Sequence, residues 1–347
     1  MEKITIVNMA RLIPSDFEAY EYMESLRWPN GEVVCPHCGV LSAGHYYLSP
    51  ADGMARLTTR GSLSQRRVWK CKDCRKQFSV TTGTVFHGSK VSLRIWLFVF
   101  FEMCANKNGI AAREIARKYG VAPKTAWFMT QRIREAMAND DSGKLSGNIV
   151  MDETYIGGKP ENWHKNDPRK SKFGNNGGRK MAAVALISEE TGEIRTKVVT
   201  NVTGTVIQTM VRDNVNTGDT TLHSDSAPLY RTIAKEMKAH HVVNHHAGQY
   251  VTEISNGTNK AENFFSQLKR SIDGTHHCIS PIHLQRYLTE FAFRHSTHDI
   301  SDTERMVRLM GQVHGIRLTY KLNRPGNSGG SPAWERGWNH GKEANWL

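Results

Sequence analysis

Two cysteine pairs with the same spacing constrain the fold of the N-terminal part of the chain. Cys35 and Cys38 lie in "CPHC", and Cys71 and Cys74 lie in "CKDC". Each such turn can direct two thiolates at one ion, and two turns together supply the ligands of a tetrahedral zinc site. A site with four thiolates has no open position. We therefore predict a structural Zn²⁺ that supplies much of the folding energy of a zinc ribbon.

The gap between the two pairs is unusually long, because 32 residues separate Cys38 from Cys71. Strand-forming residues surround turn residues in "RLTTRGSLSQRRVWKC" (56–71), so we predict an inserted hairpin there. A redox role is the alternative for the CxxC turns, although nothing nearby resembles a thioredoxin unit. The isolated Cys104 and Cys278 are predicted to be packing residues.

The charge of the chain indicates a polyanionic partner. Lys and Arg number 46 against 33 Asp and Glu, which gives a net charge of +13 over 347 residues and a pI near 9.5. Such a balance favours nucleic acid, although a basic soluble enzyme is the alternative. The N-terminus lacks a secretory signal, and the longest apolar run, "IWLFVFF", is too short to cross a bilayer. We expect a soluble, intracellular protein with no membrane partner and with reduced thiols.

Residues 92–137 are predicted to form three helices. Helices are predicted over 92–107, 110–120 and 122–137, with a turn at Gly120–Val121. The apolar stripe of the third helix comprises Ala126, Met129, Ile133 and Met137. The polar residues expected outside this stripe are Lys124, Gln131, Arg132 and Arg134. Two short helices joined by a glycine turn, the second basic on its free face, are typical of a helix-turn-helix. A plain helical hairpin is the alternative.

After a predicted linker at 139–148, strands and helices follow in a mixed order. Strands are predicted in "IVMDETYIGG", on both sides of a turn in "KMAAVALISEETGEIRTKVVTNV", in "TTLHSD" and in "HHVVNH". Helices are predicted in "TVIQTMVRDNV", in "SAPLYRTIAKEM" and from about residue 259. Three consecutive strands followed by alternation indicate an α/β fold with a mixed sheet, in the element order of ribonuclease H-like folds.

Three acids are candidates for one site. Asp152 and Asp225 occur where predicted strands end, and Glu262 lies beside the apolar stripe of the last helix. Carboxylates that meet in this way repel one another unless divalent cations neutralise them, and such a site can hold two Mg²⁺ ions about 4 Å apart. Each aspartate could instead be a turn or capping acid, and Glu262 could form a capping box with Asn259. Glu153 competes with Asp152, and periodicity does not choose between them.

Five sequence motifs, spread over most of the chain, occur together and in a fixed order in a known family. They are "WKCKDCRKQFSVTTGTVFHGSK", "MDETYIGGK", "HSDSAPLY", "TNKAENFFSQLKRSIDGTHHCIS" and "HLQRYLTEFAFRHS". Together, from about residue 18 to 300, the chain resembles the zinc-ribbon-bearing group of bacterial DDE insertion-sequence transposases. The resemblance places the DDE triad on Asp152, Asp225 and Glu262, with Mg²⁺ or Mn²⁺ as the catalytic metal. Lys269 matches the basic residue that often follows the third acid. The long ribbon gap and the C-terminal tail are the parts that it supports least.

This resemblance implies a DNA transposase that acts in the bacterial cytoplasm in association with the nucleoid. Such an enzyme cleaves a phosphodiester at the transposon end and joins the freed 3′-OH to target DNA by transesterification. The implied partners are double-stranded DNA, as terminal inverted repeats and target, and further copies of the chain, since two ends must be brought together by at least a dimer. Two alternatives stay open. One is a DNA-binding regulator with a silent α/β domain, and the other is a ribonuclease H-like nuclease that cuts without joining.

Basic residues in several segments are predicted to contact DNA. They are Lys124, Arg132, Lys159, Lys269, Arg270 and His276. Lys159 belongs to a Gly- and Lys-rich loop at 157–180. The expected domains are an N-terminal segment with the zinc ribbon (1–90), the helix-turn-helix region (91–140) and the catalytic domain (147–300). A C-terminal extension (301–347), partly disordered, completes the chain.

Overall fold

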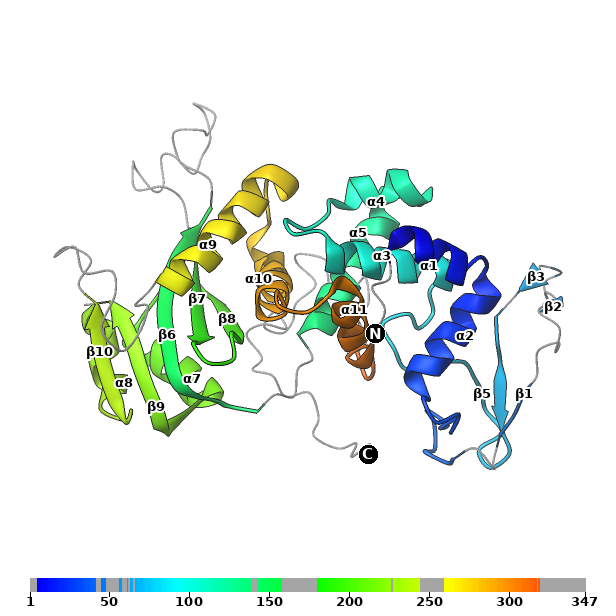
Figure 1. The fold of residues 1–347 in the computed structure, drawn as a ribbon, viewed down its shortest axis with the longest axis horizontal. Helices are drawn as coiled ribbons and strands as arrows, with labels where there is room; N and C mark the ends of the chain where they lie inside the picture. The colour runs from blue at the N-terminus through cyan, green and yellow to red at the C-terminus, as the bar shows by residue number, and fades with distance from the viewer. Residues whose placement is uncertain are drawn as a thin grey trace, which may run out of the picture. The chain divides into compact units, whose positions relative to one another are not determined.

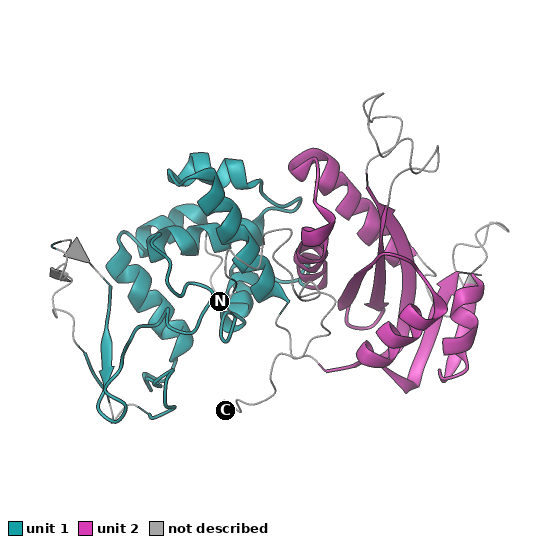
Figure 2. Ribbon diagram, turned by 180° about the vertical axis from the view of Figure 1, so that it is seen from behind, with its two compact units in different colours: residues 1–140, 297–318 teal, residues 141–296, 319–347 magenta. Residues whose placement is uncertain are grey.

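The computed structural model describes residues 5–41, 45–47, 56–57, 61, 63–64, 66–138, 143–157, 180–225, 227–243, 259–316 and 318. The chain forms two compact units (Figure 2). Unit 1 comprises residues 1–140 and 297–318, and unit 2 comprises residues 141–296 and 319–347. Unit 2 is therefore inserted between two parts of unit 1. Of the helices that the structure describes, none has the length and apolar character needed to cross a membrane.

Unit 1 begins with two helices and a set of short strands (Figure 1). The elements are α1 (Ile6–Leu12), α2 (Asp16–Arg27), β1 (His45–Tyr47), β2 (Arg56–Leu57), β3 (Leu63–Ser64), β4 (Trp69–Cys71) and β5 (Gln77–Phe78). A capping box between Ser15 and Glu18 starts α2. The strands β1, β4 and β5 form an antiparallel sheet in that order. The strands β2 and β3 pair with each other, which confirms the hairpin predicted within residues 56–71.

The helical part of unit 1 consists of α3 (Leu93–Ala105), α4 (Ala112–Tyr119) and α5 (Pro123–Met137). Gly120 ends α4 with a φ of 65°, and Pro123 occupies the first turn of α5. The predicted stripe of α5 is buried, but Gln131 and Arg134 are buried too, at 0% and 1% exposure. Their predicted place outside the core was wrong, because α5 packs against both α3 and α4 and so buries more than one stripe.

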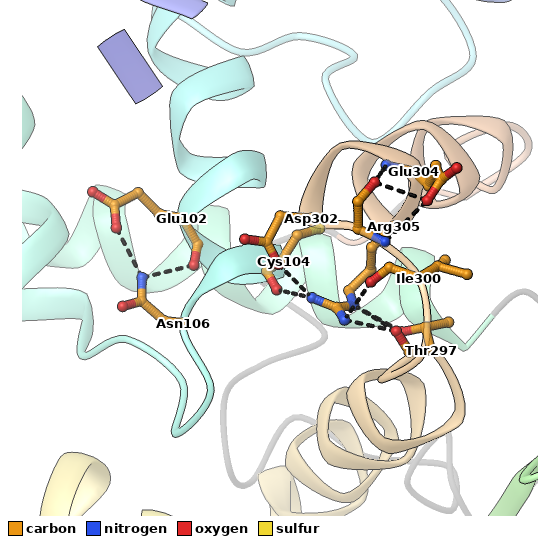
Figure 3. Close-up of polar contacts among 9 residues, drawn as sticks. Glu102, Cys104, Asn106, Thr297, Ile300, Asp302, Glu304 and Arg305 are labelled. Carbon is orange, nitrogen blue, oxygen red and sulfur yellow. Dashed lines mark hydrogen bonds and ion pairs between the residues drawn. The ribbon is translucent and has the colours of Figure 1, made fainter. Parts of the chain in front are cut away.

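The segment that follows unit 2 returns to unit 1 as α11 (Asp302–Gly311). Figure 3 shows its anchor, Arg305, which donates to the carbonyl oxygens of Cys104 at 2.7 Å and Thr297 at 2.6 Å. The extension predicted at 301–347 therefore begins as an ordered helix of unit 1. The Gly-, Asn- and Pro-rich residues 319–347 lie outside the described ranges.

Unit 2 is built on one five-stranded mixed sheet. Its strands are β6 (Leu145–Ile156), β7 (Met181–Ser188), β8 (Ile194–Val199), β9 (Val215–Asp225) and β10 (Ala239–Val243). They lie in the order β10-β9-β6-β7-β8, with β6, β7 and β8 antiparallel and β6, β9 and β10 parallel. This arrangement confirms the predicted ribonuclease H-like fold class. The predicted linker at 139–148 was too long, since β6 already begins at Leu145.

Helices cover both faces of this sheet. They are α7 (Gly204–Asn214), the 3₁₀ turn η4 (Pro228–Tyr230), α8 (Arg231–Ala234), α9 (Asn259–Ser271), the π-helical turn η6 (Ile272–His276) and α10 (Pro281–Ser296). Successive strand residues face opposite sides, so Val150 packs with α9 and α10 while Met151 packs with α7 and α8 (Figure 1). The helix predicted at 226–237 is shorter than expected, because only η4 and α8 form within it.

Candidate functional site

Asp152 and Asp225 lie side by side on neighbouring parallel strands. The register of β6 and β9 pairs Val150 with His223, and the two aspartates each follow two residues later. Both carboxylates therefore point to the same face of the sheet at the same level. Asp225 ends β9 as predicted, but Asp152 does not end β6. The strand continues to Ile156, because β6 keeps its antiparallel partner β7 after β9 has ended.

Glu262 comes to this face from α9. Its neighbours Ala261, Phe264 and Phe265 pack in the same core as Val150, while the Glu262 side chain is exposed beside them. Asn259 is the first described residue of α9, and the capping box between Asn259 and Glu262 stays an alternative for this end of the helix. Residue 258, which precedes the helix, is outside the described ranges.

The electrostatics of Asp152 show that the three acids interact. The pKa of Asp152 is raised to about 7, first by burial and further by the negative charges of Glu153, Asp225 and Glu262. The backbone N–H of Glu153 donates to Asp152 Oδ1 at 2.8 Å and opposes this rise. The backbone N–H of Ala227 holds Asp225 Oδ1 at 3.0 Å. All the donor atoms are carboxylate oxygens, which suit Mg²⁺ or Mn²⁺, and a cation there would relieve the repulsion.

Glu153 lies on the opposite face of β6. It accepts a hydrogen bond from the hydroxyl of Tyr230, which is buried in the core under α7 and α8. Burial raises the pKa of Glu153, the Tyr230 hydrogen bond lowers it, and the charge of Asp225 raises it. Tyr230 was not singled out from the sequence, although it stands five residues after Asp225 in "HSDSAPLY". Only the pairing of β6 with β9 brings the two side chains together.

The four cysteines of the CxxC turns meet in unit 1. Their Sγ atoms all lie within 4.8 Å of one another, with Cys35 to Cys74 at 3.7 Å and Cys38 to Cys71 at 3.6 Å. Tetrahedral zinc with Zn–S bonds of about 2.3 Å requires sulfur atoms about 3.8 Å apart, so the geometry fits this ion. Burial raises the pKa of Cys35 to about 12, so its thiolate needs a neighbouring cation at neutral pH.

The two CxxC turns have the same main-chain closure. The backbone N–H of Cys35 donates to Val40 O at 3.0 Å, and that of Cys71 donates to Lys76 O at 3.1 Å. In each turn the residue after the second cysteine has a positive φ, 77° at Gly39 and 57° at Arg75. The turns thus present their thiolates in the same way, as a shared ion requires.

Comparison with known families matches both sites. Residues 144–296 match the family described as ISXO2-like transposase domain, and residues 14–77 match the transposase zinc-ribbon domain. The first range contains all three acids, and the second contains all four paired cysteines. The chain belongs to the zinc-ribbon-bearing insertion-sequence transposases of the DDE type. The predicted zinc ribbon is thereby confirmed, and the cysteine cluster with this domain supports a structural Zn²⁺.

A relative of this transposase has been curated from Halobacterium salinarum. It is described as "Uncharacterized protein in transposable element ISH50" and is 26% identical over 288 residues, which cover 81% of this chain and 90% of the relative. A solved structure, "CryoEM structure of simian T-cell lymphotropic virus intasome in complex with PP2A regulatory subunit B56 gamma", aligns at 10% identity with a TM-score of 0.27. That alignment covers 51% of this chain and 63% of that chain. The latter similarity is too low to inform the fold.

The side chains that are predicted to contact DNA in this transposase differ in exposure and in their hydrogen bonds to the rest of the protein. Lys124, Lys269 and Arg270 have exposed side chains. Arg132 instead donates to the carbonyl oxygens of Val85 at 2.8 Å and His87 at 3.2 Å, and its guanidinium lies over the Phe128 ring.

His276 and Lys159 complete the set of predicted DNA contacts. The His276 ring is half-buried and lies edge-on to Tyr287 at 4.9 Å between centroids. Lys159 and most of its loop lie outside the described residues. A direct contact with DNA stays a prediction for all six residues.

Proposed function

We propose that this transposase cleaves the phosphodiester at its transposon ends and joins the freed 3′-OH to target DNA, with Asp152, Asp225 and Glu262 as the ligands of two Mg²⁺ or Mn²⁺ ions. The observation that carries the proposal is the convergence of these acids, from β6, β9 and α9, on one face of the sheet. Bound at this site, two divalent cations supply activation of the attacking oxygen and stabilisation of the leaving oxygen.

The residues of the site have distinct tasks in this proposal. Asp152 is half-buried, and because its metal-free pKa is raised to about 7, a cation that binds it near neutral pH must displace a proton. Asp225 is oriented by the Ala227 amide. Glu262 completes the site from the exposed side of α9. Lys269 and Arg270, two turns further along α9, are placed to bind DNA phosphates next to the cut.

The proposed division of labour follows the domains. The helix-turn-helix region, residues 91–140 with Lys124, binds the terminal inverted repeats. The catalytic domain, residues 147–300, cuts and joins, and the zinc ribbon within residues 1–90 supports binding. Two ends must meet for joining, so we propose a homo-oligomer, at least a dimer, that acts on the chromosome in the cytoplasm. Joining is a transesterification, so it needs no nucleotide cofactor.

The test is a cleavage and strand-transfer assay with duplexes that carry the ends of the element encoding this chain. Asp225→Asn and Glu262→Gln should each lower Mg²⁺-dependent cleavage and joining by about a thousandfold or more, because each removes a charged metal ligand. Both variants should still bind the ends in a mobility-shift assay. Asp213→Asn, which removes an exposed acid from α7, is the matched control and should keep wild-type activity.

The outcomes separate the alternatives. Full activity of the Asp225→Asn variant would disprove the assignment of the catalytic site. Wild-type protein that binds the ends but never cuts them would be a regulator, and wild-type protein that cuts without joining would be a nuclease of the same fold.

A further inference from the structure

The second CxxC turn carries exposed cations that the first turn lacks. Its cations are Lys72, Arg75 and Lys76, and all three side chains are exposed. The residues at the corresponding positions of the first turn are Pro36, Gly39 and Val40. Because the two turns have the same main-chain closure, they differ in side-chain chemistry rather than in shape. Because the first turn forms without such cations, a zinc-binding CxxC turn does not by itself require them.

Arg75 adopts a backbone conformation that does not favour arginine. Its φ of 57° lies in the left-handed region, where Gly39 of the first turn has a φ of 77°. Glycine takes this conformation without a steric clash, whereas a residue with a Cβ does so at a cost. A strained residue on an exposed turn suggests that its side chain is needed there.

The three cations have no partner in the part of the chain that the structure describes. No ion pair or side-chain hydrogen bond involves Lys72, Arg75 or Lys76 among those residues. The turn also contains one exposed acid, Asp73, so cations outnumber acids by three to one. Four thiolates around one Zn²⁺ carry a net negative charge, and a structural explanation is that the cations only balance it.

The turn is mounted rigidly on unit 1. Strand β4, which leads into it, is fixed to α2 through Glu24. Glu24 Oε1 accepts from Trp69 Nε1 at 3.0 Å, and Oε2 accepts from Arg67 Nε at 2.9 Å. The Arg67 guanidinium also lies over the rings of Phe17 and Tyr47. Cations on a fixed turn lose little conformational freedom when they bind a regular array of charges.

We propose that the turn 72–76 binds the phosphate backbone of duplex DNA. This inference rests on the proposed function, and it assigns the contribution of the zinc ribbon to one turn and to the DNA backbone. Backbone contacts of this kind position a protein on a duplex without reading its sequence. The turn therefore contributes equally to binding of transposon ends and of unrelated DNA, and its contribution weakens with salt.

The experiment measures how DNA affinity of the full, zinc-loaded chain depends on NaCl. The variants are Arg75→Gly, which keeps the backbone conformation, and the double variant Lys72→Gln with Lys76→Gln. Each lost phosphate contact should reduce the slope of log Kobs against log salt by about 0.9. The reduction should be the same on an end-bearing duplex and on a scrambled duplex of equal length. Arg11→Gln with Lys90→Gln removes two exposed cations of unit 1 that lie outside the zinc ribbon and the helix-turn-helix region, and it should leave the slope unchanged.

Zinc content and thermal stability are measured on the same variants. Lost zinc or a lowered Tm with an unchanged salt slope would mean that the cations only balance the thiolates, which overturns the inference. An unchanged slope with zinc retained overturns it as well. If wild-type protein cuts and joins ends while these variants keep its slope, only this inference fails. If wild-type protein binds neither duplex, the proposed function fails first.

Discussion

The two candidate metal sites of this transposase are built in opposite ways. The cysteine cluster of unit 1 comes from two short turns with equivalent main-chain hydrogen bonds, and it supplies four thiols, of which those of Cys35 and Cys71 are buried and that of Cys38 is exposed. The acid cluster of unit 2 comes from β6, β9 and α9, and Glu262 leaves one side of it exposed. A closed site of four protein ligands suits a structural ion, whereas an open site leaves room for substrate oxygens.

The two sites therefore depend on metal for folding to different extents. Without an ion, the cysteine turns rest on ribbon strands that are only two or three residues long and on the hydrogen bonds that Trp69 and Arg67 donate to Glu24. The acids of unit 2 instead lie on a sheet whose two cores form without them, and their mutual repulsion opposes the metal-free fold. In our proposal, one site depends on its metal for structure, and the other accepts charge repulsion in the metal-free fold so that it can bind its metals.

The largest expected effect is the loss of zinc. Cys71→Ser, or a chelator of Zn²⁺, should unfold the sheet of β1, β4 and β5, because the free energy of binding a structural zinc is on the order of 10 kcal/mol. Hydrogen exchange should show lost protection in these strands and unchanged protection in β6 and β7. The control is Cys278→Ser, which removes an exposed cysteine outside the cluster and should change neither region. Loss of protection in β7 after zinc removal would contradict the separation of the two sites.

A smaller effect of opposite sign is expected from Asp152→Asn in unit 2. The pKa of Asp152 is raised from 3.8 to about 7, so the folded state binds a proton more tightly than the unfolded state. The metal-free stability of wild-type unit 2 should therefore fall as the pH rises from about 4 to about 7. The amide of the variant has no charge to bury, so above pH 7 it should be more stable than wild type, by about 4 kcal/mol.

This prediction is checked by metal-free urea denaturation of the full chain, followed through the protection of β6 and β7. Added Mg²⁺ should stabilise the wild type increasingly as the pH rises, and should not stabilise the Asp152→Asn variant. A metal-free wild type whose unit 2 keeps constant stability between pH 4 and pH 7 would disprove the electrostatic account of the site.

Unit 1 should respond to pH in the other direction. The pKa of His314 is lowered to about 4, first by burial and then by the charge of Arg27. Its unfolded-state pKa is near 6.5, so stability is full above pH 6.5 and is lost as the pH falls toward 4. The loss attributable to this residue should be about 3 kcal/mol. His314→Gln should flatten the acid limb of a stability–pH profile for the zinc-loaded chain. An acid limb of equal steepness in this variant would assign the sensitivity to zinc release instead.

The sequence predicts what depends on neighbouring residues and misses what depends on the packing of distant ones. The CxxC spacing, the glycine turn before α5 and the strand-forming segments are local, and the structure agrees with each of them. The burial of Arg134 and the return of α11 to unit 1 depend on contacts made across the chain. Arg305, for example, reaches Cys104 some 201 residues earlier, and no periodicity announces that contact.

The acid site shows the same limit at closer range. Alternation placed Asp152 and Glu153 on opposite faces of one strand, but it could not say which face would receive α9. In the structure, the pairing of β6 with β9 brings Asp152 level with Asp225 on the face that α9 covers. On the opposite face, the Tyr230 hydroxyl donates to Glu153. Three acids were therefore selected from the sequence as a hypothesis about a family, while their convergence is a property of the sheet.

The smallest expected effect compares the two CxxC turns directly. Arg75→Gly relieves a left-handed residue with a φ of 57°, so the zinc-loaded chain should gain about 1 kcal/mol. Gly39→Arg introduces the same conformation into the first turn, where the φ is 77°, and should lose a similar amount. Chemical denaturation of the ribbon, monitored by hydrogen exchange of β4, measures both. Equal and opposite changes in the free energy of unfolding would show that the left-handed conformation costs the same in both turns and that Arg75 is kept for its charge. A loss of stability on Arg75→Gly would show instead that its side chain holds the ribbon together.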